Sequence, residues 1–177
     1  MGLQDREKAI LFYRHSIKNK EIHTLEETAK EFGLTKERII TVKESNAYFN
    51  KAKIQSSQDA YEYIKPFWSD DIEIYESFFI LLLNRSNNTI GYAKISQGGI
   101  TGTIVDKKII AKYAIDTLAS GIILAHNHPS GNEQPSDADQ KITDDIKGVL
   151  NIIDVTLLDH IILTKDTFTS FADDGLL

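Results

Sequence analysis

The sequence predicts an α/β (or α+β) domain, in which a mixed sheet is flanked by helices, preceded by a small helical segment at the N-terminus. Two observations favour this class. Apolar runs of strand length, the longest of them Phe78 to Leu83 ("FFILLL"), alternate with segments of helical periodicity. Hydrophobic residues make up 41% of the 177 residues, which is enough for a buried core.

Residues 1–45 are expected to form helices. Apolar residues recur at near-helical spacing in "DREKAILFYRHSI", and Thr24 with Glu27 three residues later forms a capping box. Gly33 ends that helix, and another begins from Thr35. A helix, a turn with glycine and a second helix form the helix-turn-helix signature. Periodicity is poor from residue 44 to residue 54, so we place a domain boundary there.

The second domain is expected to span residues 54–177. The stretch "SSQDAYEYIKPFW" predicts a short capped helix that ends near Pro66. The runs "YESFFILLLN" and "TIGYAKIS" predict two strands of a hairpin, with "RSNN" as their turn. Two helices are predicted by "DKKIIAKYAIDTLA" and "PSDADQKITDDIKGVL", separated by the buried strand "GIILAH". The last strands are predicted by "VTLLDHIILT" and "TFTSFAD".

Charge is divided unevenly along the chain. Residues 1–55 hold 11 Lys and Arg against 8 Asp and Glu, whereas the remainder holds 9 against 18. A basic N-terminal segment followed by an acidic remainder suggests two roles for the chain. By itself, this division of charge gives only slight support for nucleic-acid binding. The chain opens without the apolar stretch of a signal peptide, and no apolar run is long enough to span a bilayer. We therefore expect a cytoplasmic protein without a membrane partner.

The stretch "AHNHPSGNEQPSDAD" predicts a metal site. His126 and His128 follow a buried strand, and residues two apart on a strand point to the same face. Ser136 is expected to be the N-cap of the next helix, with Asp139 in its first turn. A lone surface histidine or a Ser-x-x-Asp cap needs no metal, but their conjunction favours one. The chain has no cysteine, so thiolate zinc sites and disulfides are excluded. Two imidazoles and a carboxylate are typical of a catalytic zinc with a water in its fourth position.

This stretch also resembles a known family. His126, His128, Pro129, Ser136 and Asp139 match the H-x-H-P-x(6)-S-x-x-D pattern of the JAMM (JAB/MPN) metalloprotease-like proteins. Together with "LLDHIIL", it resembles the bacterial RadC branch, historically labelled a DNA repair protein. The resemblance implies a cytidine deaminase-like sheet flanked by helices, one Zn²⁺, and hydrolysis of a peptide or isopeptide bond. It does not settle the substrate.

The resemblance further implies a glutamate general base at the start of an upstream strand. Glu76 stands in that place, and Glu73 is its rival, although on a strand Glu73 would face the other side. In this hypothesis Glu76 takes a proton from the metal's water and passes it to the leaving amine. Ser136 would stabilise the oxyanion, a role that competes with its role as N-cap. His160 is either a buried core histidine or a partner behind the site.

The N-terminal segment resembles the helix-turn-helix in the C-terminal region of bacterial sigma factors. On that resemblance "TKERIITVKE" is the recognition helix, and it offers Lys36, Arg38 and Lys43 to DNA. It departs from the pattern because sigma recognition helices are more basic. The leading function is a zinc hydrolase of RadC-like JAMM type. The alternatives are a DNA-associated protein whose metal domain is structural or binds partners, and a catalytically silent interaction domain, against which the intact metal ligands argue.

Overall fold

The computed structural model describes residues 51–68, 72–98 and 105–177. The chain divides between Phe49 and Asn50 into two units, and the description below concerns the second. The expected N-terminal helices lie outside the described residues, and so do Lys36, Arg38 and Lys43. DNA binding by this segment therefore stays a prediction.

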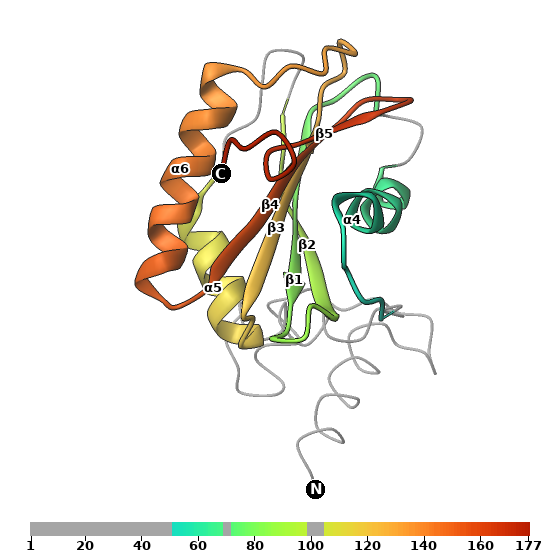
Figure 1. Ribbon diagram of the computed structural model, residues 1–177. Coiled ribbons are helices and arrows are strands. Elements are labelled where there is room, and N and C mark those ends of the chain that lie inside the picture. The colour runs from blue at the N-terminus through green and yellow to red at the C-terminus, as the bar shows by residue number, and fades with distance from the viewer. Residues whose placement is uncertain (1–50, 69–71, 99–104) are drawn as a thin grey trace, which may run out of the picture. The chain divides into compact units, whose positions relative to one another are not determined.

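Every helix and strand predicted for residues 54–177 is present. The elements are α4 (Ser57–Ile64), the 3-10 helix η1 (Lys65–Phe67), β1 (Ser77–Leu83), β2 (Thr89–Gln97), α5 (Lys107–Thr117), β3 (Gly121–Asn127), α6 (Asp137–Ile152), β4 (Thr156–Leu163) and β5 (Phe168–Ser170). The strands form one five-stranded sheet in the order β2-β1-β3-β4-β5 (Figure 1). Strands β3 and β4 are parallel, and the other neighbours are antiparallel. The sheet is therefore mixed, and the expected α+β class is confirmed.

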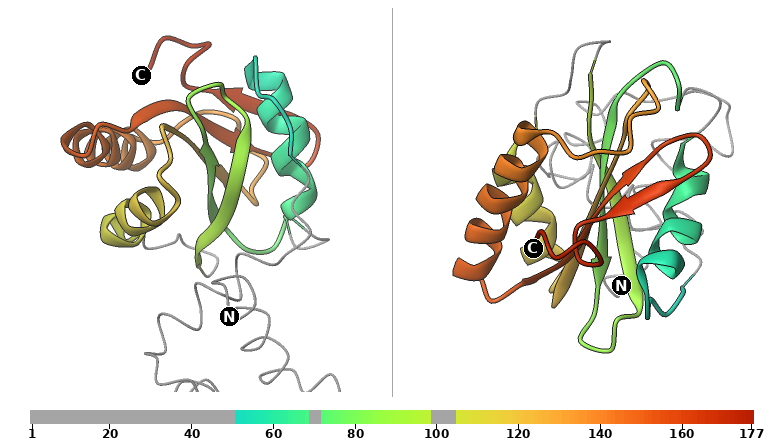
Figure 2. Two further views of the ribbon diagram at one scale, coloured as in Figure 1. Left: turned by 90° about the horizontal axis from the view of Figure 1, so that it is seen from below. Right: turned by 45° about the horizontal axis from the view of Figure 1, so that its top comes forward.

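The sheet separates two apolar cores. Helices α5 and α6 cover one face and α4 covers the other (Figures 1 and 2). Successive residues of β1 enter different cores, as side chains alternate along a strand. The α5/α6-side core contains Phe78, Ile80, Leu82, Ile110, Ile122, Leu124, Ile146 and Leu150, and the α4-side core contains Ala60, Ile64, Trp68, Phe79, Leu81, Leu83, Ile123 and Ala125.

A β-bulge between β3 and β4 sets the direction of the "DH" pair in β4. Ile122 pairs with Leu157, but Ile123 pairs with Asp159, so Leu158 has no counterpart on β3. After this extra residue, Asp159 faces the α4 side and His160 faces the α5/α6 side. Without the bulge the two would exchange faces, because a shift of one residue reverses the side-chain pattern of a strand.

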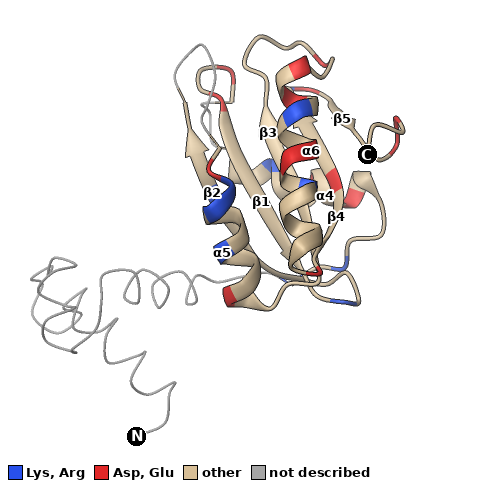
Figure 3. Cartoon of the chain, turned by 90° about the vertical axis from the view of Figure 1, so that its left-hand side faces the viewer, with Lys and Arg blue, Asp and Glu red and all other residues tan. Residues whose placement is uncertain are grey.

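Charged side chains lie mainly on the helices and loops, and the strands carry few of them (Figure 3). Within the described residues, each helix is too short or too polar to cross a lipid bilayer. The acidic balance predicted for this part of the chain is therefore carried by the surface around the sheet.

We expect Leu118→Gly to stabilise the protein. Leu118 follows α5 in the left-handed region with φ of 53°, and it is 85% exposed. A left-handed conformation costs an L-residue about 1–2 kcal/mol, whereas glycine adopts it freely at some entropic cost. The free energy of unfolding in urea should rise by roughly 0.5–1 kcal/mol. Leu118→Ala keeps the Cβ and should give no such gain, so an equal gain in both variants would contradict this explanation.

Candidate metal centre

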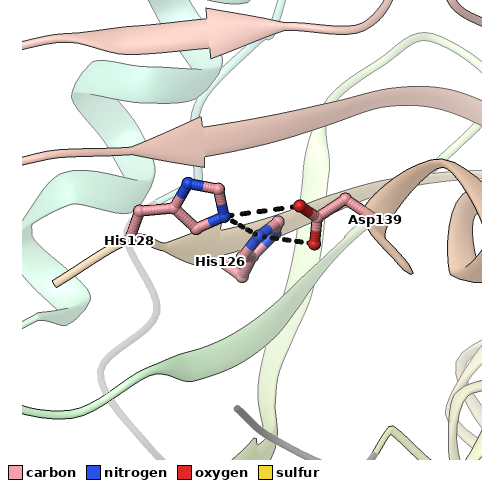
Figure 4. Close-up of side chains that lie close together, drawn as sticks. All are labelled: His126, His128 and Asp139. Atoms are coloured by element: carbon pink, nitrogen blue, oxygen red, sulfur yellow. Dashed lines mark hydrogen bonds and ion pairs between the residues drawn. The ribbon is translucent and has the colours of Figure 1, made fainter. Parts of the chain in front are cut away.

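The structure brings the three predicted metal ligands together. His126 lies near the end of β3, His128 follows it, and Asp139 lies in the first turn of α6 (Figure 4). The two Nε2 atoms are 3.0 Å apart. Asp139 places Oδ1 3.1 Å from Nε2 of His126 and Oδ2 3.4 Å from Nε2 of His128. One nitrogen from each ring and the carboxylate therefore face a common point.

The spacing of these atoms fits a tetrahedral metal ion. Bonds of about 2.0–2.1 Å at tetrahedral angles place the ligand atoms about 3.3 Å apart. The three contacts of 3.0–3.4 Å bracket that value. Imidazole nitrogen and carboxylate oxygen suit Zn²⁺ and also other divalent ions. The residues present therefore fit the cofactor that the sequence predicts.

The N-cap of α6 holds the carboxylate ligand. The Ser136 backbone N–H and hydroxyl both donate to Oδ2 of Asp139, at 2.8 and 2.6 Å, and the Asp139 N–H donates back to the Ser136 hydroxyl at 3.2 Å. This reciprocal capping box confirms the predicted N-cap. The same serine hydroxyl that would bind an oxyanion is thus engaged with Asp139.

A backbone contact orients His128. Its backbone N–H donates to the Leu163 carbonyl at 2.9 Å, which continues the ladder between β3 and β4 by one residue. Its Nδ1 lies 2.7 Å from the Asn132 carbonyl. A carbonyl only accepts, so Nδ1 carries the proton and Nε2 is free to bind a metal when the ring is neutral.

Burial and hydrogen bonding set the ionisation of the site. Burial opposes the charge of Asp139, but its contacts with His126, His128 and Ser136 outweigh it and hold the pKa of the carboxyl well below its usual range. The hydrogen bond to Asp139 raises the pKa of His128 despite burial. Burial keeps the pKa of His160 well below its ordinary value. The site thus offers an ionised carboxylate at neutral pH.

A cleft of about 530 Å³ opens beside the ligands, and Glu73, Glu76, His128 and Ser136 are among the residues that line it. Phe78 of β1 lies opposite His126 of β3, and the Ser77 N–H donates to the Asn127 side chain. Glu76 and His128 line this cleft together, and the negative charge of Glu76 contributes to raising the pKa of His128.

The expected position of Glu73 is wrong. It lies in a turn before β1 and not on a strand, so the alternation of a strand does not turn it away. Both glutamates line the same cleft. Glu73 forms an ion pair with Lys165 at 2.9 Å, a contact that distinguishes it from Glu76.

Asn127, between the two histidines, was not predicted from the sequence as part of the site. Its side chain is fully buried on the α4 side of the sheet. Its Oδ1 accepts from Nε1 of Trp68 at 2.7 Å and from the Ser77 N–H at 2.8 Å. Its Nδ2 donates to the carbonyls of Ile72 and Tyr75 at 2.6 and 2.8 Å. Asn127 therefore fixes the segment that precedes β1, which carries both candidate acids. Strand alternation was the signal that could have identified it. Because side chains alternate along a strand, the amide of Asn127 must point to the face opposite the metal ligands.

Two descriptions of His160 were left open by the sequence, and Thr143 was not predicted as part of the site. His160 is completely buried, and its Nε2 lies 2.8 Å from Nδ1 of His126. Its Nδ1 lies 2.6 Å from the Thr143 hydroxyl. Both descriptions left open for His160 are thus correct, since it is a core residue and it lies directly behind a ligand.

The mixed sheet, with two histidines at the end of β3 and an aspartate at the start of α6, defines a domain of the JAMM (JAB/MPN) class. Comparison with known families is more specific. Residues 54–176 match the family described as "RadC-like JAB domain", and the chain belongs to this family.

Relatives named "UPF0758 protein" share the match. One from Flavobacterium johnsoniae is 45% identical over 124 residues, which are 70% of this chain and 53% of the relative. One from Porphyromonas gingivalis is 40% identical over 128 residues, 72% of this chain and 56% of the relative. One from Pelodictyon phaeoclathratiforme is 34% identical over 175 residues, 94% of this chain and 78% of the relative. The chain thus spans little more than half the length of the first two.

We expect Asn127→Ala to destabilise the protein strongly. The substitution leaves two donors and two carbonyls without their buried partner. At about 1–3 kcal/mol for each unsatisfied group, with partial relaxation, the free energy of unfolding should fall by roughly 3–5 kcal/mol. Asn151→Ala, at an exposed position of α6, is the matched control and should change it by less than about 0.5 kcal/mol. Similar losses in both variants, measured by urea denaturation, would refute the role given to Asn127.

Proposed function

We propose that the chain is a zinc-dependent hydrolase that cleaves a peptide or isopeptide bond. One observation carries the proposal: two imidazole nitrogens and a carboxylate converge at tetrahedral spacing beside a cleft that also carries a glutamate. Membership of the RadC-like JAB family supports the same reaction type, which the JAMM resemblance implies. The protein or peptide that serves as substrate is not defined by this argument.

The proposed mechanism divides the work between four side chains. His126, His128 and Asp139 hold the ion, which when bound lowers the pKa of a water and polarises a carbonyl. Glu76 accepts a proton from the attacking water at its carboxylate and then donates it to the leaving amine. The position of Glu76 in the cleft that His128 also lines supports this assignment.

Ser136 has two roles to reconcile. Its hydroxyl donates to Oδ2 of Asp139. To stabilise an oxyanion it must turn its proton toward the cleft, which it lines. In the proposed mechanism the backbone N–H of Ser136, at 2.8 Å, continues to hold Asp139 during that rotation. The serine can thus serve the substrate without releasing the ligand.

Metal content tests the first part of the proposal. The purified protein should hold about one zinc per chain, because three protein ligands and a water complete a tetrahedral site. The double variant His126→Ala and His128→Ala, and separately Asp139→Ala, should lose it. His23→Ala, outside the described residues, is the matched control and should keep it. Equal zinc in all four proteins by elemental analysis would rule out this site.

The second part is tested by Glu76→Gln, which keeps the shape of the side chain but cannot accept the proton. We expect normal zinc content and a similar melting temperature. Hydrolysis of peptide and isopeptide reporter substrates should fall by roughly 10²–10⁴-fold. Glu73→Gln is the matched comparison in the same cleft, and it should retain most of the activity. If Glu73→Gln is inactive and Glu76→Gln is active, the base is Glu73.

A further inference from the structure

A hydrogen-bonded chain runs behind the metal ligands, inside the α5/α6-side core. Nδ1 of His126 contacts Nε2 of His160 at 2.8 Å, and Nδ1 of His160 contacts the Thr143 hydroxyl at 2.6 Å. That hydroxyl lies 2.5 Å from the backbone carbonyl of Asp139, one helical turn earlier. This series of hydrogen bonds therefore starts at the metal ligand His126 and ends on the backbone of the metal ligand Asp139.

The contact between the Thr143 hydroxyl and the Asp139 carbonyl determines which atom donates in each of the other contacts. A carbonyl oxygen cannot donate, so the single Thr143 proton must point to Asp139. The Thr143 hydroxyl therefore accepts from Nδ1–H of His160. With its proton on Nδ1, a neutral His160 carries a lone pair on Nε2, which accepts from Nδ1–H of His126. The proton of neutral His126 is then on Nδ1, and its Nε2 is left with the lone pair that a metal requires.

We propose that Thr143 and His160 are positioning residues, which form a relay that holds His126 in its metal-binding tautomer. This inference rests on the metal site proposed above. A hydrogen bond to the outer nitrogen of a ligating histidine fixes its tautomer and ring orientation. Here that partner is a second imidazole, which could donate as well as accept. His160 selects the correct tautomer because Thr143 decides its direction.

The relay opposes two competing interactions in the metal-free protein. Oδ1 of Asp139 lies 3.1 Å and Nε2 of His128 lies 3.0 Å from Nε2 of His126, and both would attract a proton to that nitrogen. A proton on Nε2 blocks metal binding. Reversing the relay would set the lone pair of His160 Nδ1 against the Thr143 oxygen at 2.6 Å. The buried relay therefore keeps Nε2 of His126 free.

Packing holds the ring of His160 in place. His160 is fully buried, with its ring 4.8 Å from that of Phe171 in a stacked contact and 5.6 Å from that of Phe78. Thr143 is also buried. The aromatic contacts hold the imidazole of His160 so that each nitrogen meets its partner in the relay.

The first experiment determines the tautomer directly. Long-range proton–nitrogen correlation spectra of the full-length, metal-free protein at about pH 8.5, about two units above the ordinary pKa of a histidine side chain, distinguish the two ring nitrogens. We expect the proton on Nδ1 of both His126 and His160. A proton on Nε2 of His126 overturns the relay. This result does not depend on zinc, so it is distinct from a failure of the proposed function, which would appear as wild-type protein that binds no zinc.

The second experiment uses Thr143→Val, which has the same shape but cannot accept from His160. The proton of His126 should move to Nε2, and the zinc affinity, measured by competition with a chelating dye, should fall by roughly 10–100-fold. Thr143→Ser keeps the hydroxyl and should restore both the tautomer and the affinity. Unchanged affinity in folded Thr143→Val overturns the relay. If Thr143→Val does not fold, the wild-type spectrum and Thr143→Ser decide.

Thr89→Val is the matched control. Thr89 is fully buried on β2, where its hydroxyl accepts from the Ala52 N–H at 2.9 Å and does not contact the ligands. Its loss should lower the melting temperature without changing the zinc affinity. An equal loss of zinc affinity in Thr89→Val and Thr143→Val would show a general effect of removing a buried hydroxyl, and would overturn the relay.

Discussion

The rest of the domain depends on the alternation of side chains at the end of β3. His126 points to the α5/α6 side, where it meets His160, and Asn127 points to the α4 side, where it meets Trp68. One imidazole faces the metal site, and the next side chain fixes the segment that carries Glu76. Since both stand on one strand, paired with β1 on one edge and β4 on the other, neither can move without the other. The geometry between ligand and candidate base is therefore set by the central sheet.

Polar groups inside an apolar core are costly unless they are hydrogen-bonded. His126, Asn127, Thr143 and His160 are all at most 1% exposed, and each has a buried partner. Among the described residues, the Ser96 hydroxyl is the buried side-chain polar atom that lacks a partner. Paired buried groups favour a single arrangement, because an alternative leaves a buried donor or acceptor unpaired. The cost of burying these groups is thus the physical reason that the site is ordered from within the core.

The parts of the fold that could be predicted from sequence are those with local signals. The capping box at Ser136, the period-two and helical patterns and the ligand spacing all act within about a dozen residues. The network around the site joins distant residues, such as Asn127 and Trp68, and has no local pattern. The bulge at Leu158 also has no local sequence pattern that predicts it, yet it turns His160 toward His126. Glu73 was misplaced for a related reason, since a strand was assumed where the chain forms a turn.

The site is closed on one side and open on the other. The ring of His126 lies parallel to that of Phe78, with centroids 5.9 Å apart and planes within 10°, so the core covers this ligand on that side. The loop after His128 is tied to the β4–β5 hairpin, where Thr167 and Thr169 donate to the side chain and carbonyl of Glu133 at 2.5 and 2.8 Å. The opposite wall is tied to β3 by Asn127. Both walls of the cleft are thus fixed to the sheet, so on the proposed function a substrate would approach the metal ligands through this cleft. Recognition of a substrate then falls to side chains that the network leaves exposed, among which Ile74 lines the cleft and is 53% accessible.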